Sequence, residues 1–131
     1  MNVAVAIIYN QQGSILITQR AAHLPSGGLW EFPGGKLELH ETPAAALIRE
    51  VKEEVNLDVL RYDFITQINT QRTYDLLSLH VFLVHEYLGQ AIKVESQSDL
   101  IWAAPQTLDQ YEFPPTNSPI LAWIKRNREF L

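Results

Sequence analysis

The sequence predicts an α+β protein in which two helices enclose a mixed β-sheet as an α/β/α sandwich. Short apolar runs bounded by turn residues are spread along the chain, an amphipathic helix follows a glycine loop at residues 34–35, and a second helix begins near Pro119. With 131 residues, of which 47% are hydrophobic, the chain can bury one core. We therefore expect a single domain over residues 1–131.

The expected strands are short. Residues 3–9 and 14–19 flank the segment NQQG at 10–13, whose composition suits a hairpin, so these two strands should pair antiparallel and open the sheet. Residues 64–68, 76–87 and 100–103 are the other strand candidates, and the long apolar run at 76–87 favours a central position. Residues 20–28 and 113–115, rich in Gly or Pro, predict irregular segments.

Thr42 and Pro43 mark the start of the first helix, because Thr is a favourable N-cap and Pro is tolerated at the first helical position. The helix should run to about Val55, where Asn56 can adopt a left-handed conformation. Its expected apolar stripe comprises Ala44, Leu47, Ile48, Val51 and Val55. The expected core face of the last helix comprises Ile120, Leu121, Trp123 and Ile124.

Three glutamates share another face of the first helix. Glu50, Glu53 and Glu54 are three and four residues apart, so their charges repel one another and disfavour the isolated helix. A divalent cation removes this cost. Oxygen ligands without Cys or His favour Mg²⁺, with Mn²⁺ as an alternative, over zinc.

The net charge limits the classes of binding partner that we expect for this protein. A net charge of −5 argues against a nucleic-acid polymer, which normally meets a basic face. A phosphorylated small molecule can still bind an acidic site when cations lie between the phosphate oxygens and the carboxylate oxygens of the protein. Residues 3–9 are apolar but too short to cross a bilayer, so no membrane partner is expected. The chain has no cysteine, which is compatible with a cytoplasmic location.

The spacing of the polar and glycine positions around this helix resembles the Nudix box of the Nudix hydrolases. Five residues separate Gly35 from Glu41, and seven separate Glu41 from Arg49. The remaining positions of the motif are Glu50, Glu53, Glu54, Asn56 and Leu57. Asn56 stands where the family pattern has Gly. The resemblance implies the Nudix fold and metal-assisted hydrolysis of a diphosphate bond, with Mg²⁺ bound by the glutamates.

Three further segments resemble the MutT branch of the family, the 8-oxo-dGTP diphosphatases: residues 17–22 (ITQRAA), 30–36 (WEFPGGK) and 113–119 (FPPTNSP). The implied reaction is the hydrolysis of 8-oxo-dGTP to 8-oxo-dGMP and pyrophosphate, which removes an oxidised nucleotide before DNA replication. The box itself does not distinguish this substrate from another dNTP or a dinucleotide. A nucleotide-sensing module without catalysis is disfavoured because the three glutamates are all present.

The resemblance also implies the roles of individual residues. The expected catalytic residues are Arg49, Glu50, Glu53 and Glu54, with Arg49 and Glu41 supporting the scaffold. The expected metal ligands are Glu50, Glu53, Glu54, Glu95 and the carbonyl of Gly34. The expected substrate-binding residues are Arg20, Phe32, Lys36 and Asn117, the last reading the base. Which carboxylate acts as general base stays open.

Each of these roles has a structural alternative. Asn117 suits the N-cap of the last helix, although Ser118 can cap it instead. Glu95 and Lys36 can be solvated surface charges, and Phe32 or Trp30 can be plain core. We expect a monomer, with a homodimer as the alternative.

Overall fold

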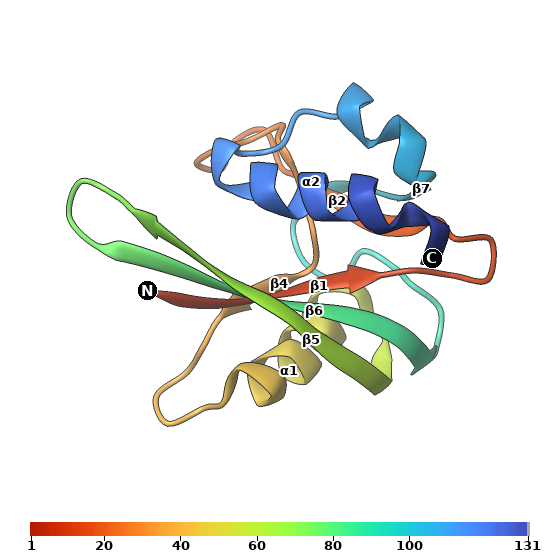
Figure 1. Ribbon diagram of the computed structural model, residues 1–131, viewed down its shortest axis with the longest axis horizontal. Helices are drawn as coiled ribbons and strands as arrows, with labels where there is room; N and C mark the ends of the chain where they lie inside the picture. Colours follow the sequence, from red (N-terminus) through yellow and green to blue (C-terminus); the bar gives the residue numbers. More distant parts are fainter. Residues whose placement is uncertain (131) are drawn as a thin grey trace.

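The computed structural model describes residues 1–130 as two β-sheets and two α-helices, in agreement with the predicted α+β class (Figure 1). The strands are β1 (Asn2–Ile8), β2 (Ile15–Arg20), β3 (Trp30–Glu31), β4 (Gly34–Lys36), β5 (Asp58–Gln71), β6 (Leu76–Leu88) and β7 (Gln97–Ala103). The helices are α1 (Pro43–Val55) and α2 (Ser118–Asn127), with 3₁₀ helices η1 (Pro105–Gln110), η2 (Pro115–Asn117) and η3 (Arg128–Phe130).

The larger sheet is mixed and has the order β4-β1-β6-β5. β1 pairs parallel with β6 and antiparallel with β4, and β5 pairs antiparallel with β6. The smaller sheet has the order β3-β2-β7 and is antiparallel. Figure 1 shows α1 and α2 on opposite sides of the large sheet.

The expected turn at residues 10–13 forms, since the N–H of Asn10 donates to the carbonyl of Ser14 at 3.0 Å, but the expected antiparallel pairing of the first two strands is wrong. β1 and β2 meet only through an isolated bridge between Tyr9 and Ile15, and then join different sheets. β1 is apolar on both faces, because Ala4 and Ala6 face the α1 side while Val5 faces the core under α2. A strand buried on both faces belongs in the centre of a sheet, and β1 therefore lies between β4 and β6.

β5 is far longer than the predicted segment at 64–68, since it spans 14 residues. Its sequence is largely polar, and nine of its positions are exposed. Pairing with β6 extends it, because an antiparallel partner supplies backbone hydrogen bonds that side-chain patterning does not report.

Helix α1 begins and ends as its sequence predicts. The Thr42 hydroxyl oxygen accepts a hydrogen bond from the N–H of Ala45 at 3.1 Å, and Asn56 ends the helix in the left-handed region at φ 65°. The predicted apolar stripe is corrected at one position: Ile48 is 40% exposed and Ala46 is buried instead. In α2, Ile120 and Ile124 are buried as predicted.

Candidate active site

A cavity of about 230 Å³ opens between β1, the turn joining β3 to β4, and the 3₁₀ helix η2. All four predicted substrate-binding residues line it, together with two of the predicted metal ligands. These six residues are Arg20, Phe32, Gly34, Lys36, Glu54 and Asn117. Residues from both ends of the chain therefore meet the end of α1 at one cavity.

Glu54 is the buried carboxylate of this cavity. Its Oε2 accepts a hydrogen bond from the N–H of Gly34 at 2.7 Å, which joins the last turn of α1 to β4. Burial raises the pKa of the Glu54 carboxyl from 4.5 to about 8, while the Gly34 N–H opposes the shift. The carboxylates of Glu31, Glu50 and Glu95 raise this pKa further. Such repulsion among anions favours a bound cation.

A second cavity, of about 60 Å³, adjoins the first and shares Arg20, Glu31 and Glu54 with it. Glu95 lines this smaller cavity, which brings a predicted ligand from outside the box near Glu54. Gln97 lines it as well.

Glu31 was not among the predicted site residues. It lies in both cavities, 3.8 Å from the guanidinium of Arg20, and burial raises the pKa of its carboxyl against the opposing charge of Arg20. The available signal was a single charged residue inside the otherwise apolar run at 29–32.

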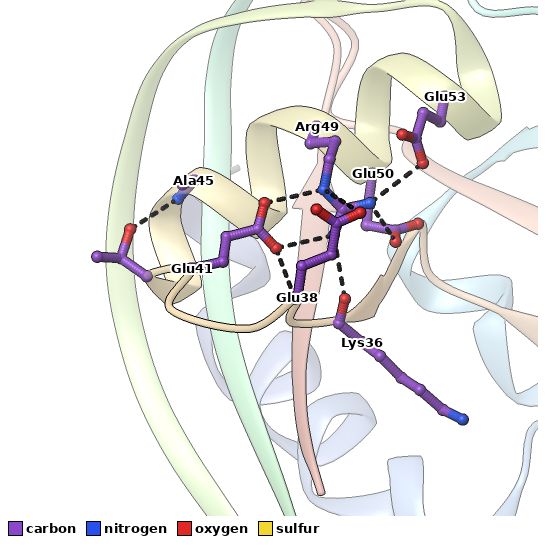
Figure 2. Close-up of polar contacts among 8 residues, drawn as sticks. Lys36, Glu38, Glu41, Ala45, Arg49, Glu50 and Glu53 are labelled. Atoms are coloured by element: carbon purple, nitrogen blue, oxygen red, sulfur yellow. Dashed lines mark hydrogen bonds and ion pairs between the residues drawn. The ribbon is translucent and has the colours of Figure 1, made fainter.

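Arg49 lies at the centre of the acidic cluster (Figure 2). Its Nε and Nη2 donate to the two carboxylate oxygens of Glu41, each at 2.8 Å. Its Nη1 donates to Glu50 at 2.8 Å and to Glu53 at 3.2 Å, and Nη2 also donates to the carbonyl of Lys36 at 3.1 Å. One guanidinium therefore fixes two glutamates of α1 and the backbone of the glycine loop.

Glu41 anchors this cluster from the loop before α1. Hydrogen bonding by Arg49 lowers the pKa of the Glu41 carboxyl to about 2, and the N–H of Glu38 assists by donating to the same carboxylate at 2.9 Å. The same contacts raise the pKa of the Arg49 guanidinium above its usual range. Glu41 is therefore a scaffold residue, as the sequence suggested.

Glu50 and Glu53 line neither of the two cavities and differ in what their side chains contact. Glu50 packs on the backbone of Gly35 so closely that a Cβ on that glycine would overlap its carboxyl group. Burial raises the pKa of the Glu50 carboxyl, although Arg49 opposes this. The side chain of Glu53 is 49% exposed, and it lines neither of the two cavities.

The predicted ligands do not form a closed metal cage. Within residues 1–130, no three acidic or histidine side chains converge closely enough to hold an ion. The donor chemistry nevertheless fits a hard divalent cation, since the carboxylates near the cavities supply only oxygen. Burial, and to a smaller extent the charges of neighbouring carboxylates, raises the pKa values of Glu50 and Glu54, and a bound cation would lower both.

On the other side of the larger cavity lies Asn117, at the N-terminus of α2. Its side chain makes no capping bond to the helix, and its Nδ2 only approaches the Thr116 hydroxyl at 3.4 Å. Ser118 is the first residue of the helix and does not replace it as a cap. The amide of Asn117 therefore keeps hydrogen-bonding capacity toward the cavity.

The other three predicted substrate-binding residues differ in their contacts with the rest of the protein. Phe32 is only 5% exposed and stacks on Phe113 with ring centroids 5.0 Å apart, so it is a core residue that also lines the cavity. Arg20 donates its Nε–H to the carbonyl of Pro25 at 2.6 Å, which holds the loop 20–28. The side chain of Lys36 extends away from the Arg49 cluster (Figure 2).

Comparison with known proteins identifies the family. The NUDIX domain model matches residues 1–130. The 8-oxo-dGTP diphosphatase of Escherichia coli (strain K12) is 34% identical over 126 residues, covering 96% of this chain and 97% of that protein. The CTP pyrophosphohydrolase of the same strain is 33% identical over 117 residues, covering 89% and 86%.

The fold comparison agrees. A structure from a study of MutT from Aliivibrio salmonicida and Vibrio cholerae superposes with a TM-score of 0.82 at 34% identity, covering 94% of each chain. No helix among residues 1–130 is long and apolar enough to cross a membrane. Nudix hydrolases generally use divalent metal cations, in keeping with the acidic cavities. The chain belongs to the Nudix family and is a Nudix hydrolase.

Proposed function

We propose that this chain is a Mg²⁺-dependent nucleoside triphosphate pyrophosphohydrolase that converts 8-oxo-dGTP to 8-oxo-dGMP and pyrophosphate. The observation that carries the proposal is the shared cavity, which has Glu54 on one side and, on the other, the Asn117 amide, which does not cap its helix. A nucleotide bound there spans both sides, with its phosphates at the carboxylates and its base at Asn117. The relative named 8-oxo-dGTP diphosphatase supports this substrate.

The residues that would hold the cation are Glu50, Glu53, Glu54, Glu95 and the carbonyl of Gly34. A bound Mg²⁺, or Mn²⁺, would neutralise charge on the phosphates and lower the pKa of a coordinated water. Arg49 orients Glu50 and Glu53 through charge-assisted hydrogen bonds.

The base would be selected by the residues on the Asn117 side of the larger cavity. The planar amide of Asn117 offers one acceptor and two donors to a purine edge that carries both a carbonyl and an N–H. Phe32 presents a ring edge to the base, and Arg20 supplies further donors. Lys36 lines the same cavity and can meet a phosphate oxygen. We further propose that the enzyme is cytoplasmic, that it is a monomer with a homodimer as the alternative, and that it binds neither a nucleic-acid polymer nor a membrane.

One observation favours a second substrate. The relative named CTP pyrophosphohydrolase matches this chain at 33% identity, close to the 34% of the first. An amide can also pair with the donor and acceptor edge of cytosine. The alternative is therefore pyrophosphohydrolysis of a different nucleotide with the same metal chemistry.

The deciding experiment is a pyrophosphate-release assay with 8-oxo-dGTP, dGTP, the other dNTPs, CTP and dinucleotides in Mg²⁺. We expect the highest kcat/KM for 8-oxo-dGTP, and Asn117→Ala should reduce its preference over dGTP by about 10- to 100-fold. Asn127→Ala is the control, because Asn127 lies on α2, donates its Nδ2–H to the carbonyl of Trp123 and lines neither cavity, so this variant should keep the preference. A higher kcat/KM for CTP than for 8-oxo-dGTP would identify CTP as the preferred substrate. An unchanged preference in Asn117→Ala would show that Asn117 does not recognise the base.

A further inference from the structure

The segment that carries Glu95 is fastened to the end of α1 at one carbonyl oxygen. The backbone carbonyl of Glu54 accepts a hydrogen bond from the N–H of Val94 at 3.2 Å. The same oxygen accepts a second bond from the side-chain Nε2 of Gln97 at 3.0 Å. The last carbonyls of a helix have no intrahelical donors, so these bonds satisfy one of them. Glu95 lies between the two attachment points.

The bond to the Glu54 carbonyl also fixes the orientation of the Gln97 amide. Exchanging its nitrogen and oxygen would place two oxygen atoms against each other, so Nε2 must face the helix and Oε1 must face away from it. Within residues 1–130, Oε1 of Gln97 is the one buried side-chain nitrogen or oxygen that has no hydrogen-bond partner. A buried acceptor without a donor costs free energy of folding, and native proteins rarely contain one.

The surroundings of Gln97 define the donor that it lacks. Gln97 lines the smaller cavity together with Arg20, Glu31, Glu54 and Glu95. With a cation bound, the three glutamates are ionised and can only accept, and neither Arg20 nor Ser96, which also lines the cavity, donates to Oε1. The cavity of about 60 Å³ is large enough for a water molecule. A hydrated divalent cation brings such water to a site rich in carboxylates.

We propose that Gln97 is a positioning residue of the metal site. Its Nε2 holds the end of α1 against the segment of Glu95, so that two carboxylates distant in sequence face one cavity. Its Oε1 accepts a hydrogen bond from a water molecule of the hydrated cation held between Glu54 and Glu95. This inference rests on the proposed function, because it assumes that these carboxylates bind a divalent cation.

The test measures Mn²⁺ binding to the full chain without nucleotide, following free Mn²⁺ by electron paramagnetic resonance. Gln97→Met keeps the length of the side chain but removes both polar contacts, and we expect the Kd for Mn²⁺ to rise by about tenfold or more. Gln97→Leu removes the same two contacts without adding charge and should raise the Kd by a similar factor. Gln71→Met is the matched control, because the Nε2 of Gln71 also donates to a backbone carbonyl, that of Arg72 at 2.9 Å, and Gln71 lines neither cavity.

Kinetics separate positioning from general stabilisation. At saturating Mg²⁺, Gln97→Met should lower kcat while KM for the nucleotide changes by less than about twofold. If the Kd of Gln97→Met for Mn²⁺ stays within about twofold of that of the unaltered chain and only its Tm is lower, the Gln97 amide has a purely structural role. That result would overturn the inference. If Gln97→Met does not fold, Gln97→Leu decides by the same criterion. Failure of the unaltered chain to bind Mn²⁺ would instead overturn the proposed metal site and this inference together.

Discussion

The Glu54 carboxylate and the backbone N–H of Gly34 form a hydrogen bond of 2.7 Å that connects the last turn of α1 to the glycine loop. The two residues are 20 positions apart in sequence. This contact places a buried anion against the loop whose carbonyl is a proposed metal ligand. The geometry of the loop and the position of the carboxylate therefore depend on each other.

Glu54 should make the metal-free protein less stable as the pH rises. Its folded-state pKa of about 8 lies above the ordinary value of 4.5, so its favourable contribution is complete below about pH 4.5 and is lost as the pH rises through 8. Glu54→Gln stays neutral and can still accept from Gly34. In EDTA, the Tm of this variant should fall less between about pH 5 and 9 than that of the unaltered chain. Parallel Tm curves would contradict the burial effect.

Gly35→Ala should affect activity more than stability. The added Cβ would overlap the end of the Glu50 side chain, which is flexible and can move away from its position. We expect kcat to fall by about 10- to 100-fold, with a smaller change in Tm. Gly34→Ala is the contrasting variant, because its Cβ would meet the backbone carbonyl of Ala4 at a positive φ of 154°. Thermal melts should show Gly34→Ala as the more destabilised of the two.

Arg49→Lys should not behave as a conservative change. Lys cannot reproduce the two parallel bonds to Glu41, nor contact Glu50 in the same geometry. The lowered pKa of Glu41 means that its stabilising effect is present above about pH 4.5 and is lost as the pH falls toward 2. Weakening that pair should move the acid-unfolding midpoint, followed by circular dichroism, to higher pH. An unchanged midpoint together with full activity would remove Arg49 from its assigned role.

Substitutions of Asn56 test the one position at which the sequence departs from the family motif. Asn56 adopts φ 65° at the end of α1, a region that costs most residues about 1–2 kcal/mol and costs Asn and Gly less. Asn56→Ala should therefore lower the free energy of unfolding by about 1 kcal/mol, whereas Asn56→Gly should change it by less than about 0.5 kcal/mol. Urea unfolding measures both variants, and equal losses would show that the left-handed geometry is not the cause.

Local patterning gave reliable boundaries for α1. The Thr42 cap and the left-handed Asn56 depend on contacts within a few residues, and both are confirmed. The rotation of the helix against the sheet was less accessible, because Ala46 rather than Ile48 faces the core. A helical wheel finds an apolar sector, but its centre is fixed by the strands on which it packs.

Long-range pairing was hardest to predict. The turn composition at residues 10–13 favoured a hairpin, yet the burial of both faces of β1 placed that strand beside β6. Glu31 and Gln97 were missed for a related reason. Their roles come from neighbours that are 23 and 43 residues away at Glu54, and no spacing within their own segments indicates that contact.

The sequence by itself determined the acidic helix, its ends and the chemical class of its ligands, because these follow from periodicity and side-chain type within a single element. Only the tertiary structure decided that Arg20, Phe32 and Asn117 share a cavity with Glu54. It also decided that Gln97 ties Glu95 to α1. Such juxtapositions arise from packing two sheets and two helices around common cores, and the information for packing is spread over the whole chain.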